Sequence, residues 1–160
     1  RAKSGPLPLL TRWVRTSENE AFRAFMIKEI GFFKQSEATP ILASMLETED
    51  SNMLKIAIIE TLGKLGHQEV EPNLFKLFPM TSKDVQRAII KAITLFKSAD
   101  GLRFLCYSYN RIVDNEIKIE VAYAIQQYGE EGSNALKELS AKSNEFGKKI
   151  FDQVTYQSGL

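Results

Sequence analysis

One short sequence pattern occurs five times in the chain. Its clearest copy, residues 54–66, reads LKIAIIETLGKLG. Each copy begins with an apolar residue, and successive ones are 29 to 32 residues apart. They are Phe22, Leu54, Val85, Ile117 and Phe146. A repeat of about 20–50 residues is typical of supersecondary units that stack on one another. The sequence therefore predicts a repeat architecture rather than a single irregular core.

The second copy shows what each unit contains. Its apolar residues recur at three- and four-residue spacing, which indicates a helix with one buried face. Ser51 precedes this helix and can accept a hydrogen bond from the first turn. Gly66 follows it and can adopt the left-handed conformation that ends helices. We expect a helix over residues 52–65, followed by a partner helix over 69–78 with Pro72 in its first turn and Pro79 at its end.

The other copies predict the same plan. Ser17 and Glu20 have the S-x-x-E spacing of a capping box at the start of the first copy. That helix should bury an apolar face made of Phe22, Phe25, Met26, Ile30 and Phe33. We expect leading helices at residues 18–33, 52–65, 83–96, 115–128 and 144–156, and partner helices at 8–15, 37–47, 69–78, 100–110 and 131–141. This makes ten helices in five antiparallel pairs.

Two glycines share one register inside leading helices. Gly31 and Gly63 each stand where glycine costs about 1 kcal/mol relative to alanine. A cost that is repeated indicates a packing need, and we expect a neighbouring helix to cross at each glycine. The units should therefore depend on one another for stability.

The segment LKIAIIETLGKLG, followed by HQEVEPNLFKLF, resembles the HEAT-like repeat of the phycobilisome-lyase type. The matching residues in this copy are Leu54, Lys55, Ala57, Glu60, Leu62, Gly63, Leu65, Gly66 and Pro72. The resemblance implies an all-α fold, a right-handed α-solenoid (α-α superhelix) of about five HEAT-like helix pairs. It also implies that the leading helices lie on the inner curve.

These patterns predict one repeat domain over residues 7–156, with units at about 7–35, 36–66, 67–97, 98–129 and 130–156. Residues 1–6 are expected to be a flexible N-terminal remnant and 157–160 a C-terminal tail. The chain begins with Arg1 rather than methionine, so we expect a fragment of a longer protein.

Composition excludes several classes of protein. The net charge of +1 gives no overall attraction to nucleic acid or anionic lipid. No apolar run approaches the roughly 20 residues that a membrane helix needs. The single cysteine, Cys106, fits a reducing compartment. We expect a cytoplasmic location, either free or as the soluble domain of a membrane-anchored bacterial protein.

No arrangement of residues predicts catalysis. His67 is the only histidine and falls in a turn, where it is expected to be a solvated or helix-capping residue. Cys106 lies in an apolar run and is expected to be a small core residue. Trp13 is expected to pack against Phe22 and Phe25. We predict no catalytic residue, no metal and no cofactor.

The candidate site is a modestly basic column on the leading helices. Arg23, Lys55 and Lys118 share one register, which Gln86 interrupts, and Arg87 and Lys91 lie close to it. We hypothesise that Arg23, Lys55, Arg87, Lys91 and Lys118 bind an acidic protein or peptide. The alternatives are a solvated face without a partner, an accessory or lyase-like enzyme subunit that holds a ligand in its groove, and a nucleic-acid-binding protein. Nucleic acid is the least favoured, because phosphate binding asks for more cations.

Overall fold

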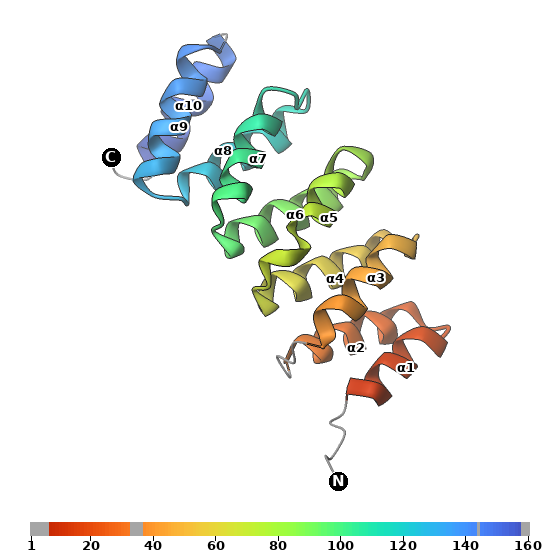
Figure 1. Cartoon of the computed structure of the whole chain (residues 1–160). Coiled ribbons are helices and arrows are strands. Elements are labelled where there is room, and N and C mark those ends of the chain that lie inside the picture. Colours follow the sequence, from red (N-terminus) through yellow and green to blue (C-terminus); the bar gives the residue numbers. More distant parts are fainter. Residues whose placement is uncertain (1–6, 33–36, 144, 158–160) are drawn as a thin grey trace. The chain divides into compact units, whose positions relative to one another are not determined.

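The computed structural model describes residues 7–32, 37–143 and 145–157, which form ten α-helices and no strand. This confirms the predicted all-α class (Figure 1). The predicted segment 1–6, Phe33, Asn144 and residues 158–160 of the predicted tail lie outside the described residues. Gln157, which was predicted to begin the tail, is the last residue of α10. The helices, with two short 3₁₀ turns (η), are α1 (Leu7–Thr16), α2 (Glu20–Phe32), α3 (Ala38–Thr48), α4 (Asn52–Leu65), η1 (Gln68–Val70), α5 (Glu71–Leu77), η2 (Phe78–Met80), α6 (Lys83–Phe96), α7 (Ala99–Tyr109), α8 (Asn115–Gln126), α9 (Glu130–Ala141) and α10 (Glu145–Gln157).

The chain divides into two compact units, Arg1–Leu95 and Phe96–Leu160. We call them unit 1 and unit 2. Their border lies next to the predicted border between the third and fourth repeats. None of the described helices is long and apolar enough to cross a membrane.

Unit 1 is a stack of helix pairs. α1 packs on α2 and α3 packs on α4, while the leading helices α2 and α4 pack directly on each other. Gly63 of α4 meets Ala92 of α6, so the stacking continues to the third leading helix. Ile58 and Ile89 thus lie on adjacent helices, and both are completely buried. The α-solenoid architecture that the repeat predicts is confirmed in this unit.

The two helix-interior glycines lie at the predicted crossings. A Cβ on Gly31 would lie 2.6 Å from Cγ2 of Thr61, and one on Gly63 would lie 3.1 Å from Cα and Cβ of Ala92. Both distances are shorter than ordinary carbon contacts. Glycine therefore lets neighbouring leading helices approach closely.

The ends of α4 lie where the sequence predicts them, but α2 begins at a different residue from the predicted one. Ser51 Oγ accepts a hydrogen bond from the Leu54 N–H at 3.3 Å, and Gly66 has φ of 77°. The predicted capping box at Ser17 is wrong, because α2 begins at Glu20 and its cap is Asn19. Asn19 Oδ1 accepts from the Phe22 N–H at 2.9 Å. Asparagine caps as well as serine does, and here it stands three residues before the N–H that it binds.

The partner helix predicted at residues 69–78 is divided into three pieces. η1 precedes α5, with Pro72 in the first turn of α5, and η2 follows it. α5 ends at Leu77 because Pro79 has no N–H to continue the α-helical hydrogen bonds.

Unit 2 is built around α8, which packs against α7, α9 and α10. Its core consists of buried apolar side chains from all four helices: Leu102, Leu105, Tyr109, Ile117, Val121, Ile125, Leu136, Ile150 and Val154. Gly132 at the start of α9 lies so close to the Ile125 carbonyl that a Cβ there would clash with it.

Candidate docking groove on the leading helices

A groove of about 430 Å³ runs between α2 and α4 in unit 1. Two of the residues that line it are large and apolar: Phe25 is 55% exposed and Met53 is 43% exposed. Lys28 and Glu60 add one positive and one negative charge. Its lining is Ala21, Ala24, Phe25, Lys28, Met53, Ile56, Ala57 and Glu60. We call this the α2–α4 groove.

The same registers continue onto α6, where their chemistry changes. The positions of Met53 and Ile56 are taken there by Asp84 and Arg87, and that of Glu60 by Lys91. Arg87 Nη1 lies 3.0 Å from Asp84 Oδ1, and Lys91 is exposed. The exposed face of the leading helices is thus mostly apolar over α2 and α4, which contribute one charge each, and charged over α6.

Arg23, the first residue of the predicted basic column, has two partners inside unit 1. Its Nε donates to the Val14 carbonyl at 2.8 Å, and its Nη2 donates to Glu49 Oε2 at 2.8 Å. Glu49 Oε1 in turn accepts from the N–H groups of Asp50 and Ser51. Arg23 therefore ties the end of α1 to the turn between α3 and α4.

Other members of this register also contact the end of the preceding helix. Gln86 Nε2 donates to the Phe78 carbonyl at 3.0 Å, as Arg23 does to Val14. Lys118 Nζ lies 4.9 Å from the centre of the Tyr109 ring, at the end of α7. Gln86, which looked like an interruption of a basic column, thus performs the same contact with a neutral donor. Lys55 in this register is half-buried.

The structure separates the five predicted binding residues into two groups. Arg87 and Lys91 lie on the exposed face that continues the α2–α4 groove. Arg23, Lys55 and Lys118 share the other register. In it Arg23 and Lys118 contact their own unit, Lys55 is half-buried, and Lys118 belongs to unit 2. Phe25 and Met53 did not stand out from the sequence, because the α-helical pattern places them on or beside apolar faces. The available signal was the register of Met53, which carries the charged Asp84 in α6.

Comparison with known families found one similarity, which covers the first part of the chain. The family model of HEAT repeats matches residues 7–81. Residues 7–81 are therefore similar to HEAT repeats. The matched span runs from α1 to just past η2 and includes both helices that form the α2–α4 groove. No curated protein sequence matches the chain.

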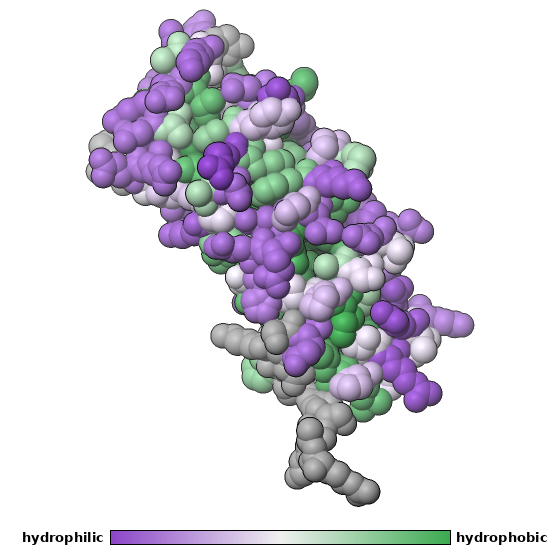
Figure 2. Space-filling model, viewed as in Figure 1, coloured by the Kyte–Doolittle hydropathy of each residue, from purple (hydrophilic) through white to green (hydrophobic). Residues whose placement is uncertain are grey.

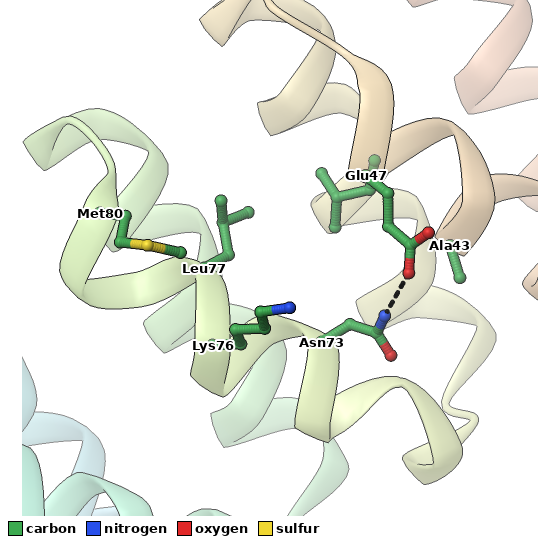
Figure 3. Close-up of a pocket in the computed structure, with 7 residues that line it drawn as sticks. Ala43, Glu47, Asn73, Lys76, Leu77 and Met80 are labelled. Carbon is green, nitrogen blue, oxygen red and sulfur yellow. Dashed lines mark hydrogen bonds between the residues drawn. The ribbon is translucent and has the colours of Figure 1, made fainter.

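A second hollow of the HEAT-like span lies between partner helices α3 and α5 and η2. Figure 3 shows Lys76, Leu77 and Met80 pointing toward the helix that bears Ala43 and Glu47. Asn73 Nδ2 donates to Glu47 Oε1 at 3.1 Å across the hollow. Its volume is about 450 Å³, and we call it the α3–α5 pocket.

His67 and Cys106 were the residues considered for catalysis or metal binding, and the structure shows what surrounds each of them. His67 Nδ1 lies 2.6 Å from Oγ1 of the buried Thr39, so its ring joins the turn after α4 to α3 rather than being merely solvated. Cys106 is half-buried; burial raises the pKa of its thiol, and the charge of Glu138 raises it further. Across the described residues no three metal-binding side chains gather.

Trp13 lies on α1 beside α2. Its ring centre is 6.4 Å from that of Phe22, which confirms the predicted contact between these two residues. Trp13 nevertheless remains 42% exposed. Figure 2 shows the general pattern of the visible surface, in which polar side chains predominate and apolar ones show between them.

Proposed function

We propose that the chain is a non-catalytic protein-interaction module, and that its α2–α4 groove binds an amphipathic, acidic segment of a partner protein. The observation that carries this proposal is the exposure of Phe25 and Met53 together in one groove between packed helices. Large apolar side chains gathered on a surface mark interaction sites. HEAT repeats, moreover, commonly serve as protein-interaction scaffolds.

Charge supports an acidic partner. Lys28 and Glu60 line the groove, while Lys91 and Arg87, the latter paired with Asp84, lie on the adjoining helix α6, so cations outnumber anions by one. A segment with apolar residues at three- or four-residue spacing could cover Phe25 and Met53 while its carboxylates meet these cations. The proposed binding set is therefore Lys28, Arg87 and Lys91 around the two apolar residues.

The remaining residues of the predicted column have other roles in this proposal. Arg23 holds α1 against the α3–α4 turn and so keeps the groove in shape. A groove that is already formed loses little conformational entropy when a partner binds. Lys55 lies in the register of Arg23 and Lys118 lies in unit 2, so neither belongs to the proposed surface.

Partner capture with matched variants tests the proposal. The immobilised chain should retain a reproducible set of proteins, and Met53→Glu and Lys91→Glu should each lose that set with thermal unfolding unchanged. Met80→Glu, at the α3–α5 pocket, is the matched control and should retain the set. Capture that survives both groove variants would contradict the proposal.

A second candidate is an accessory or lyase-like subunit that holds a small molecule, in keeping with the resemblance to phycobilisome-lyase-type repeats. The α3–α5 pocket favours it, because 450 Å³ lies within the range of roughly 300–1,000 Å³ that ligand sites occupy. Native mass spectrometry after incubation with a metabolite or chromophore extract would show a bound mass. That mass should disappear in Met80→Glu and persist in Met53→Glu.

We also propose that the chain is located in the cytoplasm. The single cysteine supports a reducing, cytoplasmic compartment.

A further inference from the structure

The α3–α5 pocket holds two opposite charges that do not pair with each other. Lys76 lines it from α5 and Glu47 lines it from α3. In Figure 3 the amine of Lys76 points into the hollow, toward the helix that bears Glu47. Within the described part of the chain, Lys76 makes no hydrogen bond or ion pair. The pocket therefore presents a positive charge that no described side chain neutralises.

Glu47 supplies the negative charge of the opposite wall. Its Oε1 accepts a hydrogen bond from Asn73 Nδ2 at 3.1 Å, which fixes where the carboxylate lies. The amide carries no charge, so this bond orients the carboxylate without neutralising it. None of the described residues is a partner of Oε2. Because a lysine and a glutamate within about 4 Å would form an ion pair, the pocket holds the two charges farther apart than that.

Apolar side chains make up the rest of the lining. The pocket residues of α5 and η2 recur at three- and four-residue spacing, which places them on one face of the chain: Asn73, Lys76, Leu77 and Met80. On α3, Leu46 is only 5% exposed, whereas Met80 is 69% exposed. A molecule in the hollow can therefore remove Met80 from water and contact Leu77, which buries apolar surface.

We propose that the α3–α5 pocket binds an apolar amino carboxylate, either a free amino acid such as leucine or a short apolar peptide with both ends free. Its carboxylate contacts Lys76, its ammonium contacts Glu47, and its apolar side chain covers Met80. This assignment of the ligand rests on the second candidate function, which places a small molecule in this pocket. It does not depend on the α2–α4 groove.

Charge complementarity favours a ligand that carries both signs. An apolar molecule with a single charge would satisfy one wall and leave the charge of the other wall facing the ligand without a partner, which costs free energy when water is displaced. A molecule that carries an ammonium and a carboxylate satisfies both walls. The pocket volume of about 450 Å³ lies within the range of roughly 300–1,000 Å³ of ligand sites, and it admits both an amino acid and a short peptide.

Two methionine methyl groups allow the pocket and the groove to be followed in one NMR spectrum. Met80 lines the α3–α5 pocket and Met53 lines the α2–α4 groove. The labelled methyl resonances are assigned with Met80→Leu and Met53→Leu, and the parent chain is then titrated in parallel with leucine and with trileucine. We expect a saturable shift of the Met80 methyl with that of Met53 unchanged. The ligand that saturates the shift at the lower concentration identifies the source, free amino acid or peptide.

Ligands that lack one charge test each wall of the pocket. The acetylated form of the better ligand has no ammonium, and its amide form has no carboxylate. Each should bind about two- to fivefold more weakly than the free form, the factor that one exposed ion pair contributes. Lys76→Met should remove only the advantage over the amide form. Glu47→Gln, which keeps an acceptor for Asn73, should remove only the advantage over the acetylated form. A residue that merely shaped the pocket would instead weaken all three ligands alike.

Two results would overturn the proposal. One is no shift of the Met80 methyl at any concentration of leucine or trileucine. The other is equal binding of the free, acetylated and amide forms, which would show apolar contact alone. A mass bound from the extract and lost in Met80→Glu, without binding of either titrant, would reject the amino carboxylate and leave the second candidate function standing. The lack of both signals would reject that function as well.

Discussion

A methyl group on Gly31 would lie 2.6 Å from Cγ2 of Thr61, where α2 and α4 cross. Thr61 has little freedom to move away. Its Oγ1 donates to the Ala57 carbonyl at 2.7 Å, and its side chain is 2% exposed. This pair therefore sets how closely the first two leading helices can approach.

Gly31→Ala should destabilise unit 1 by about 1–2 kcal/mol. Alanine gains about 1 kcal/mol of helix propensity over glycine, but the overpacked methyl should cost more than that gain. Adding Thr61→Ser removes Cγ2 while keeping the hydroxyl, and should restore most of the loss. Calorimetric melting of the single and double variants checks this. A Gly31→Ala chain that melts above the parent would contradict the close crossing.

Gly66→Ala should cost about 1 kcal/mol for a different reason. Gly66 has φ of +77°, and a Cβ there would meet no atom within 4 Å. The cost is therefore conformational rather than steric, since residues other than glycine adopt the left-handed region at a penalty. Gly66→Asn should cost less, because asparagine tolerates this region better. Equal melting temperatures for the two variants would argue against this explanation.

Arg23→Gln should destabilise unit 1 by about 1–3 kcal/mol, because it removes a hydrogen bond to the Val14 carbonyl and a charge-assisted hydrogen bond to a Glu49 side chain that is 10% exposed. Lys91→Gln, on the exposed face, should change stability by less than about 0.5 kcal/mol. Adding Glu49→Gln to Arg23→Gln should recover part of the loss, because it removes the buried charge. Urea denaturation followed by circular dichroism measures all three. Similar losses of stability in Arg23→Gln and Lys91→Gln would contradict the structural role of Arg23.

Cys106 should react slowly with iodoacetamide at pH 8. Burial, and to a lesser degree Glu138, raise the pKa of its thiol, so less of the reactive thiolate is present in the folded chain. The rate should increase on raising the pH and also on unfolding in urea. Alkylation of the folded chain at the rate of the unfolded one would show that the thiol is neither buried nor perturbed.

Local signals predicted the helices because the residues that end them act within one turn. Ser51 and Gly66 perform the capping roles that their types suggest, and Gly31 and Gly63 lie where a repeated cost indicated a crossing. The cap of α2 escaped prediction because Asn19 and Ser17 are both good N-caps, two residues apart. Only the position of the Phe22 N–H distinguishes them.

The candidate site was harder to predict, because it depends on which helix ends lie side by side. Sequence register grouped Arg23 with Lys118 by charge. It could not reveal that Arg23 faces the Val14 carbonyl and Glu49, or that Gln86 makes the equivalent contact. Phe22 and Phe25 fit the buried pattern of the repeat, and they are exposed because none of the described leading helices precedes α2.

The place of Trp13 determines what an optical melting curve of this protein records. Tryptophan emission comes from a single ring on α1, at the edge of unit 1, while unit 2 has no indole of its own. Fraying of one terminal helix would therefore alter the whole fluorescence signal, whereas complete loss of residues 96–160 from the folded state would pass almost unseen.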